Sequence, residues 1–148
     1  MRDILFRGKT KDGRWVYGSY LHPTMHWHRF GVHRSWIVDA MQNGGYLNLT
    51  ARAAVIDNTV GQYTGIDDAN GQKIYEGDIV RFTRIDALGW IRERTGVVKY
   101  YSELPVFYIL ASTGDAWDWV DCGDLRVIGN IHDNPELMEA EHGESESE

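Results

Sequence analysis

Arginine and tryptophan concentrate in one short stretch of this sequence, between residues 81 and 94. Trp90 stands there among four arginines and two acids, which are Arg81, Arg84, Arg92, Arg94, Asp86 and Glu93. An aromatic ring can stack on a nucleic-acid base while neighbouring guanidinium groups hold phosphates. We expect a polar loop at 86–94, with Trp90, Arg92 and Arg94 as candidate macromolecule-binding residues. In the competing interpretation the ring fills the core and the charges are solvated.

A second aromatic group, DAWDWVD at residues 115–121, is acidic instead of basic. Trp117 and Trp119 would share one face of an extended strand, beside Asp115, Asp118 and Asp121. Aromatic grooves of this kind suit basic or proline-rich peptides. Trp117 and Trp119 are therefore further candidate binding residues, and the alternative is again that both rings pack into the core.

Four histidines lie close together in the first third of the chain, at His22, His26, His28 and His33. If the chain is extended there, His26 and His28 point to one face, and both could reach a metal ion. No third ligand lies close by, and Asp39 is the nearest acid downstream. The group is either a metal site or a polar loop; we favour the loop and expect neither metal nor cofactor.

Catalytic signatures are missing from the sequence. It contains no phosphate-binding GxxxxGK[ST] or GxGxxG, and no GxSxG or HExxH. The DDANG segment at 67–71 resembles a calcium loop, but that alignment puts Ile66 at the first ligand position and Gly77 where a bidentate Glu is needed. A hairpin turn is the better interpretation, and we do not expect an enzyme.

Charge is distributed unevenly along the 148 residues, whose net charge is -7. Residues 1–56 hold eight Lys/Arg against three Asp, which gives +5, and residues 57–138 hold seven against fourteen acids, which gives -7. Such asymmetry fits a basic face for an anionic partner, self-association of opposite faces, or simple mixing on one surface. The last ten residues carry five Glu and no Lys or Arg, and we expect a disordered tail at 139–148.

Cys122 is the single cysteine, so the chain can form no internal disulfide. No apolar run approaches the roughly 20 residues of a membrane span. We therefore expect a cytoplasmic protein without membrane contact.

Aromatic residues and glycine-rich turns favour a mainly β protein. Turns are expected at Asp12-Gly13, at 42–45 and at Asn70-Gly71, and the last of these is expected to be a two-residue turn. A short helix is expected at 135–140, with Asn134 as its N-cap. Strands are expected at 4–7, 14–21, 36–40, 46–55, 79–85, 97–101, 106–111, 117–120 and 126–131.

The segment YEGDIV at 75–80 reads as structural. Gly77 permits a sharp backbone angle, and Asp78 can accept hydrogen bonds from backbone N–H groups beyond the turn. Gly129 in VIGNIHDNPEL is interpreted in the same way, as a bulge or a close backbone approach.

Three segments in order resemble the YopX family of phage and prophage proteins: ILFRGKTKDGRWVYG at 4–18, TVGQYTGIDDANGQKIYEGDIV at 59–80 and LRVIGNIHDNPEL at 125–137. The resemblance implies a small SH3-like barrel in the C-terminal part, and the strand count agrees. We expect an N-terminal β-hairpin unit at 1–56 with the histidine loop, a YopX-like barrel with one short helix at 57–138, and the tail.

The resemblance supplies a phage or prophage context in a bacterial host, and no residue with an assigned function. The leading hypothesis is a non-enzymatic accessory protein that binds an unknown host or phage protein in the bacterial cytoplasm, with a homo-oligomer as a further prediction. The alternative is a nucleic-acid-binding module that uses a basic aromatic face. A small hydrolytic or metal-dependent enzyme is a distant third.

Overall fold

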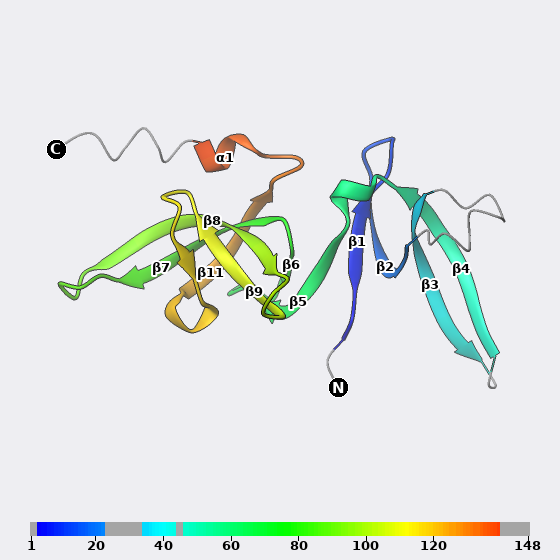
Figure 1. Cartoon of the computed structure of the whole chain (residues 1–148), viewed down its shortest axis with the longest axis horizontal. Coiled ribbons are helices and arrows are strands. Elements are labelled where there is room, and N and C mark those ends of the chain that lie inside the picture. Colours follow the sequence, from blue (N-terminus) through cyan, green and yellow to red (C-terminus); the bar gives the residue numbers. More distant parts are fainter. Residues whose placement is uncertain (1–2, 23–33, 44–45, 140–148) are drawn as a thin grey trace. The chain divides into compact units, whose positions relative to one another are not determined.

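The computed structural model describes residues 3–22, 34–43 and 46–139, with the backbone alone at 40–43 and 46–52. The chain forms two compact units, Met1–Tyr63 and Thr64–Glu148 (Figure 1). Residues 57–63, at the start of the expected barrel domain, group with the first unit. The expected tail at 140–148 and the glycines of the expected 42–45 turn lie outside the described residues.

Antiparallel strands make up the first unit. They are β1 (Phe6–Lys9), β2 (Trp15–Leu21), β3 (Ser35–Asn43) and β4 (Tyr46–Val55), followed by the 3-10 helix η2 (Asp57–Thr59) and β5 (Gly61–Asp67), which continues past Tyr63. β1 pairs with both β2 and β5, and β3 pairs with β2 and β4. Ile37, Val38 and Val55 are buried in this unit.

The second unit holds a five-stranded antiparallel sheet, with strand order β10-β9-β8-β7-β11. Its core consists of Ile74, Val80, Phe82, Val98 and Ile109. The elements are β6 (Lys73–Tyr75), β7 (Asp78–Ile85), β8 (Ile91–Tyr101), β9 (Val106–Ala111), β10 (Ala116–Trp117), the 3-10 helix η3 (Trp119–Asp121), β11 (Gly123–Asn130) and α1 (Glu136–Glu139). The expected mainly β fold with a short C-terminal helix is confirmed, whereas the SH3-like barrel stays a prediction.

Four turns of the described chain share one geometry. Each spans five residues, and its first N–H donates to the fifth carbonyl at 2.7–2.9 Å while the fourth N–H donates to the first carbonyl at 2.9–3.0 Å. The fourth residue is always glycine, with φ between +80° and +91°, which only glycine adopts at no cost. The turns begin at Thr10, Asp68, Asp86 and Ala111. The two-residue turn expected at Asn70-Gly71 is therefore wrong, because the loop has three residues.

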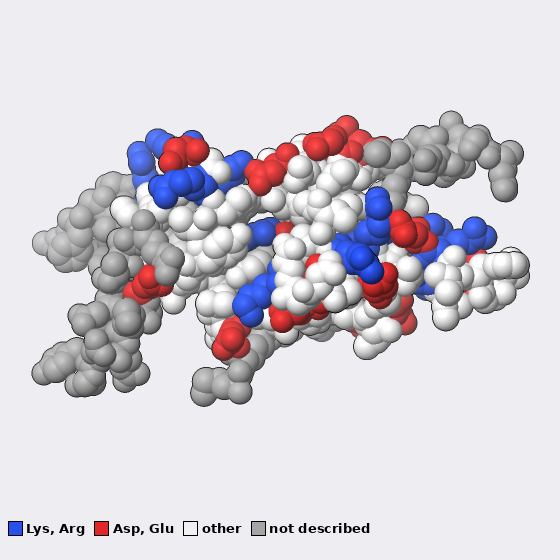
Figure 2. Space-filling model, turned by 180° about the vertical axis from the view of Figure 1, so that it is seen from behind, with Lys and Arg blue, Asp and Glu red and all other residues white. Residues whose placement is uncertain are grey.

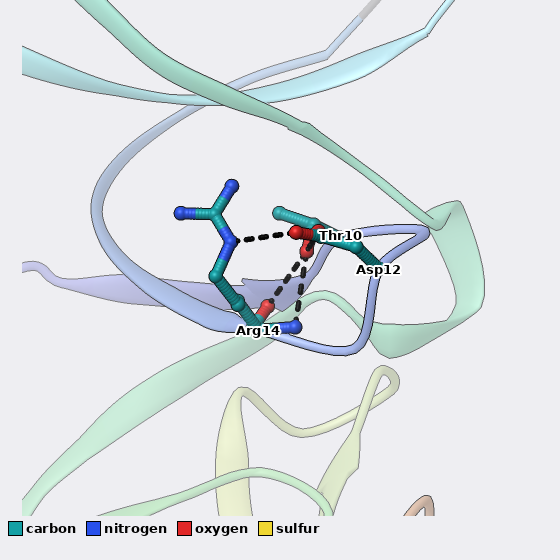
Figure 3. Close-up of polar contacts among 3 residues, drawn as sticks. All are labelled: Thr10, Asp12 and Arg14. Atoms are coloured by element: carbon teal, nitrogen blue, oxygen red, sulfur yellow. Dashed lines mark hydrogen bonds and ion pairs between the residues drawn. The ribbon is translucent and has the colours of Figure 1, made fainter.

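Side chains reinforce the first of these turns (Figure 3). The Asp12 carboxylate accepts hydrogen bonds from the Thr10 hydroxyl and from Arg14 Nε, the latter at 2.8 Å. These two donors hold the pKa of Asp12 below its usual value. The contacts join residues two positions apart, so the turn is specified by local sequence, as we expected for Asp12-Gly13.

Two predicted elements near the candidate site are wrong. The loop expected at 86–94 ends at Trp90, because β8 begins at Ile91 and pairs with β7 from Ile85↔Ile91 onward. The strand expected at 117–120 ends at Trp117, because the Asp118 side chain accepts the Trp119 N–H at 2.9 Å and begins a 3-10 turn. The helix expected at 135–140 is confined to Glu136–Glu139.

The YEGDIV segment joins three parts of the second unit. Gly77 has φ +87°, its N–H donates to the Val98 carbonyl at 2.8 Å, and its carbonyl accepts the Ile131 N–H at 2.9 Å. The buried Asp78 carboxylate accepts the Tyr75 N–H at 2.8 Å, from a donor that precedes the turn. These bonds give the segment the structural role predicted for it.

Gly129 lies at a register shift between β11 and β7. A Cβ at this position would lie 2.6 Å from Asn134 Oδ1, so the expected close approach is confirmed. The same Asn134 oxygen accepts the Asn130 N–H at 3.3 Å, which directs the side chain toward β11.

Candidate functional site

The turn between β7 and β8 is built by one aspartate. Asp86 Oδ1 accepts the N–H groups of Leu88 and Trp90, both at 2.9 Å, and Oδ2 accepts Arg92 Nε at 3.1 Å. The Trp90 N–H lowers the pKa of Asp86 most strongly, and Arg92 lowers it further against the effect of desolvation. The charged Asp86 carboxylate therefore holds the five-residue turn between β7 and β8 in one conformation.

Strand alternation determines which candidate residues meet. Asp86 N–H donates to the Trp90 carbonyl, so the β7–β8 ladder extends to this pair beyond Ile85↔Ile91. Residues two apart share a face, which places Trp90, Arg92 and Arg94 together. Arg84 is the direct cross-strand partner of Arg92 and joins the same face. The three residues singled out from the sequence therefore lie together, on a strand instead of a loop.

Arg84 links the two candidate groups. Its guanidinium carbon lies 3.2 Å from the centroid of the Trp117 ring, in a cation–π contact. Its Nε is buried and has no hydrogen-bond partner among the described residues. Arg92 has Asp86 at 3.1 Å and Arg81 has Glu93 at 3.1 Å, and all four side chains except the half-buried Asp86 are exposed. Exposed pairs contribute about 0–1 kcal/mol, so they can exchange partners at little cost.

Large apolar side chains crowd the turn end of this hairpin. Ile85 and Ile91 face each other across the strands, and together with Val120 from η3 they line a cleft of about 320 Å³. Each member of the group is between 64% and 88% exposed. We call this group the hairpin surface; it consists of Ile85, Leu88, Trp90, Ile91 and Val120. Trp90 therefore does not fill the core.

Trp117 and Trp119 pack against the core cluster at its edge, and both are half-buried. Trp119 Nε1 donates to the Phe107 carbonyl at 2.9 Å, which fixes the ring. The core-packing interpretation therefore applies to both rings, although Trp117 also lines a groove with Asp118.

Family membership follows from comparison with known proteins. The sequence model of the YopX protein family matches residues 5–139, which is nearly the whole chain. The chain belongs to the YopX family. No curated protein matches it.

A solved structure supports the fold of this YopX-family protein. The chain is similar to the crystal structure of protein EF1440 from Enterococcus faecalis, with a TM-score of 0.56 and 20% sequence identity. The match covers 93% of the YopX-family chain and 99% of the Enterococcus protein. At this identity the likeness concerns the fold alone.

Charges of both signs mix on one face of the YopX-family protein. On the face shown in Figure 2, Lys and Arg lie beside Asp and Glu instead of forming a separate basic area. This agrees with the simplest of the three interpretations of the sequence asymmetry. The local excess of arginine on the β7–β8 hairpin is therefore a better guide to a partner than the charge of either half.

Cys122 lines the cleft beside the hairpin surface. Burial raises the pKa of its thiol to about 11, and Asp121 and Asp118 add to the rise while Arg84 opposes it. The thiol is neutral at physiological pH, and a neutral thiol is a poor nucleophile.

Only His22 of the four-histidine group lies among the described residues. His26, His28 and His33 lie outside the described residues, and the described His22 packs edge-on against Tyr20, with ring centroids 5.8 Å apart. Within the described part of the chain, no three His, Cys, Asp or Glu side chains gather in a way that could hold a metal ion. No described helix is long and apolar enough to cross a membrane.

Proposed function

We propose that this YopX-family protein is a non-enzymatic accessory protein of a phage or prophage, which acts in the bacterial cytoplasm by binding another protein. The observation that carries the proposal is the hairpin surface, whose five large apolar side chains are 64–88% exposed, with Ile85, Ile91 and Val120 lining one cleft. Contiguous exposed apolar groups mark interaction sites, whereas isolated ones are ordinary. Trp90, on the opposite face of the same hairpin, is 64% exposed, and exposed tryptophans are common binding hot spots.

Arginines around the hairpin surface define the chemistry of the partner. Arg81, Arg84, Arg92 and Arg94 all lie on β7 and β8, and only Arg81 and Arg92 have a carboxylate within ion-pair distance among the described residues. The matching partner presents apolar side chains flanked by carboxylates, since guanidinium groups pair with carboxylates in two-point contacts. Support for a non-enzymatic role comes from Cys122, whose neutral thiol is unsuited to nucleophilic catalysis.

Affinity capture with matched variants tests this function. The protein is immobilised, exposed to nuclease-treated lysate of the bacterial host, and its bound proteins are quantified by mass spectrometry. The double variant Ile85→Thr/Ile91→Thr keeps β-branched residues in the strands but removes apolar surface, and Ile4→Thr is the control, since Ile4 is equally exposed in the first unit. We expect at least one stoichiometric protein that binds wild type and Ile4→Thr, and is lost about tenfold or more with the double variant. Identical capture by all three forms would overturn the proposal.

A second function, binding of single-stranded nucleic acid, is favoured by one specific observation. Trp90, Arg92 and Arg94 share a face with Arg84, so one ring and three guanidinium groups lie together. If three phosphates are neutralised, affinity for a fluorescein-labelled dT20 strand should fall about 20-fold between 50 and 200 mM salt. The Arg94→Gln variant should weaken binding and flatten this salt dependence. Absence of binding at 50 mM salt would remove this function from consideration.

A further inference from the structure

A second surface of the C-terminal unit has different chemistry from the hairpin surface. Tyr101 of β8 pairs with Val106 of β9, and strand alternation puts Tyr108 and Leu110 on the same face. Residues of the neighbouring strand β10 and Asp118 also line this groove, which has a volume of about 420 Å³. We call it the tyrosine groove; its lining includes Tyr101, Val106, Tyr108, Leu110, Trp117 and Asp118.

Side-chain contacts hold the aromatic lining of the groove in place. The Tyr101 and Tyr108 rings meet edge-on, with centroids 6.4 Å apart and planes at 87°. The ring of Trp117, a further lining residue, is covered by the Arg84 guanidinium. Side chains already fixed in the free protein lose little conformational entropy when a ligand binds.

Carboxylates dominate the charge around the tyrosine groove. Asp118 lines it, and its Oδ1 accepts the Trp119 N–H, so this oxygen anchors the carboxylate. Glu103 Oε2 accepts the Tyr101 hydroxyl at 3.0 Å, and Asp115 immediately precedes β10. Two cations oppose these three carboxylates, Lys99 as the cross-strand partner of Tyr108 and Arg84 on the Trp117 ring, so one negative charge remains in excess. The groove therefore favours a cation over an anion.

We propose that the tyrosine groove binds an extended peptide segment in which arginine alternates with proline. Aromatic-lined grooves receive the flat faces of proline residues, and a polyproline II segment is already extended before it binds. Arginine stacks on aromatic rings and pairs with carboxylates, so it matches both the walls and the rim. This site is separate from the hairpin surface, and its partner has the opposite charge.

Fluorescence anisotropy with three labelled decapeptides tests the proposal on the full-length protein. The probe is five Arg-Pro repeats, and the comparison peptides are five Glu-Pro and five Arg-Gly repeats. We expect the Arg-Pro peptide to bind about tenfold or more tightly than the Glu-Pro peptide, because the charges are reversed. It should also exceed the Arg-Gly peptide, which has no preformed extended conformation. Equal binding of the Arg-Pro and Glu-Pro peptides, or no binding of the Arg-Pro peptide, would overturn the proposal.

Matched variants localise the binding. Asp118→Asn keeps the oxygen that accepts the Trp119 N–H but removes the charge, and should weaken the Arg-Pro complex about threefold. Tyr101→Ser should weaken it about fivefold by removing one aromatic wall, whereas Tyr101→Phe should retain most of the affinity. Glu136→Gln, at an exposed position in α1, is the control and should have no effect.

Three outcomes of the variant series would overturn the proposal. The first is an unchanged affinity for the Arg-Pro peptide in both Asp118→Asn and Tyr101→Ser. The second is a loss of affinity in Glu136→Gln as large as in the groove variants. The third is that the wild-type protein self-associates and Tyr101→Ser makes it monomeric, because the groove would then bind a second copy. Both groove positions are solvent-accessible, and thermal melting confirms that each variant is folded. The Ile85→Thr/Ile91→Thr protein should bind the peptide normally, so failure of the groove proposal and failure of the hairpin proposal can be told apart.

Discussion

The turns that begin at Asp68 and Asp86 are built alike and serve different ends. In both, Oδ1 of the aspartate accepts the N–H groups two and four residues later, at 2.8–2.9 Å. In both, a glycine at the fourth position has positive φ. The difference lies in the second oxygen. Asp68 Oδ2 accepts the Val127 N–H of β11 at 3.0 Å, whereas Asp86 Oδ2 accepts the exposed Arg92 side chain.

This difference separates a structural turn from a recognition turn. Asp68 is buried and joins segments 59 residues apart in the chain, and the neighbouring Ala69 N–H also donates to the Leu125 carbonyl. Asp86 joins only residues of its own hairpin, which leaves the apolar side chains of that hairpin free for a partner. The same local pattern therefore ties the turn between β5 and β6 to β11 in one case, and presents the hairpin surface at the turn between β7 and β8 in the other.

The largest expected effect is that of Asp68→Ala. The substitution leaves the half-buried Val127 N–H without its acceptor and removes the acceptor of the N–H groups of the exposed turn residues Asn70 and Gln72. Loss of a buried acceptor costs about 1–3 kcal/mol, so we expect a decrease of about 3 kcal/mol in the free energy of unfolding. Urea denaturation monitored by tryptophan fluorescence measures it.

Asp86→Ala is the matched control for Asp68→Ala. It removes the same local hydrogen bonds but no long-range one. Its free energy of unfolding should therefore fall by less than half as much as that of Asp68→Ala. Equal destabilisation by the two alanine variants would contradict the division into a structural and a recognition turn.

Glycines extend the comparison to the YEGDIV segment. Gly77 and Gly89 have nearly the same φ, +87° and +82°, but Gly77 is buried and bonded to Val98 of β8 and to Ile131 after β11, whereas Gly89 lies in the exposed turn. Gly77→Val should lower the free energy of unfolding by more than about 2 kcal/mol, because a β-branched residue is strained there and the backbone cannot relax. Gly89→Val should cost less. Thermal melting compares the two, and an unchanged melting temperature for Gly77→Val would refute the structural role of the segment.

Acid should remove the contribution of the charged Asp68 carboxylate to the stability of the fold. Burial acts to raise the pKa of this carboxyl, but the N–H groups of Val127, Gln72 and Asn70 together with Arg126 lower it below the usual value. Because the folded-state pKa is depressed, its stabilising contribution is present above the unfolded pKa of about 3.9 and is lost as pH falls through the folded value. Wild type should therefore exceed Asp68→Asn in melting temperature at pH 7, and the gap should narrow below about pH 4. A constant gap from pH 7 to pH 3 would contradict this origin.

The smallest effect concerns Cys122, in the cleft beside the hairpin surface. With a thiol pKa of about 11, alkylation by iodoacetamide should be slow at pH 8 and should accelerate up to about pH 11. Since the folded-state pKa is raised, the neutral thiol favours the folded state, and this contribution is lost as pH rises above the unfolded value. Thiolate absorbance followed against pH measures the titration, and a midpoint near 8.5 would show that the cleft does not bury the thiol.

Local patterns in the sequence predicted most strands correctly. The strands at 46–55 and 106–111 match β4 and β9 at both ends, because Leu47 and Leu49 alternate with polar residues in the first and the second is a continuous apolar run. The start of β8 was missed because Arg92, Glu93 and Arg94 give no apolar alternation. Their extended conformation depends on pairing with β7.

The candidate site was only partly readable from the sequence. Residue type identified Trp90, Arg92 and Arg94, and the structure brings them together on one face. The stacking of Arg84 on Trp117 could not be read, since it joins residues 33 positions apart through tertiary packing. The bond from Val127 to Asp68 was hidden for the same reason, although the Asp-x-x-Gly spacing was a usable signal for both turns.

Quantitative capture of one host or phage protein by wild type and by Ile85→Thr/Ile91→Thr tests the central claim most directly. The account predicts a stoichiometric protein partner that survives nuclease treatment, is retained by Ile4→Thr, and is lost with the double variant although that variant melts as a folded protein. Capture that disappears after nuclease treatment, or that does not depend on Ile85 and Ile91, would contradict the claim that the hairpin surface binds a protein.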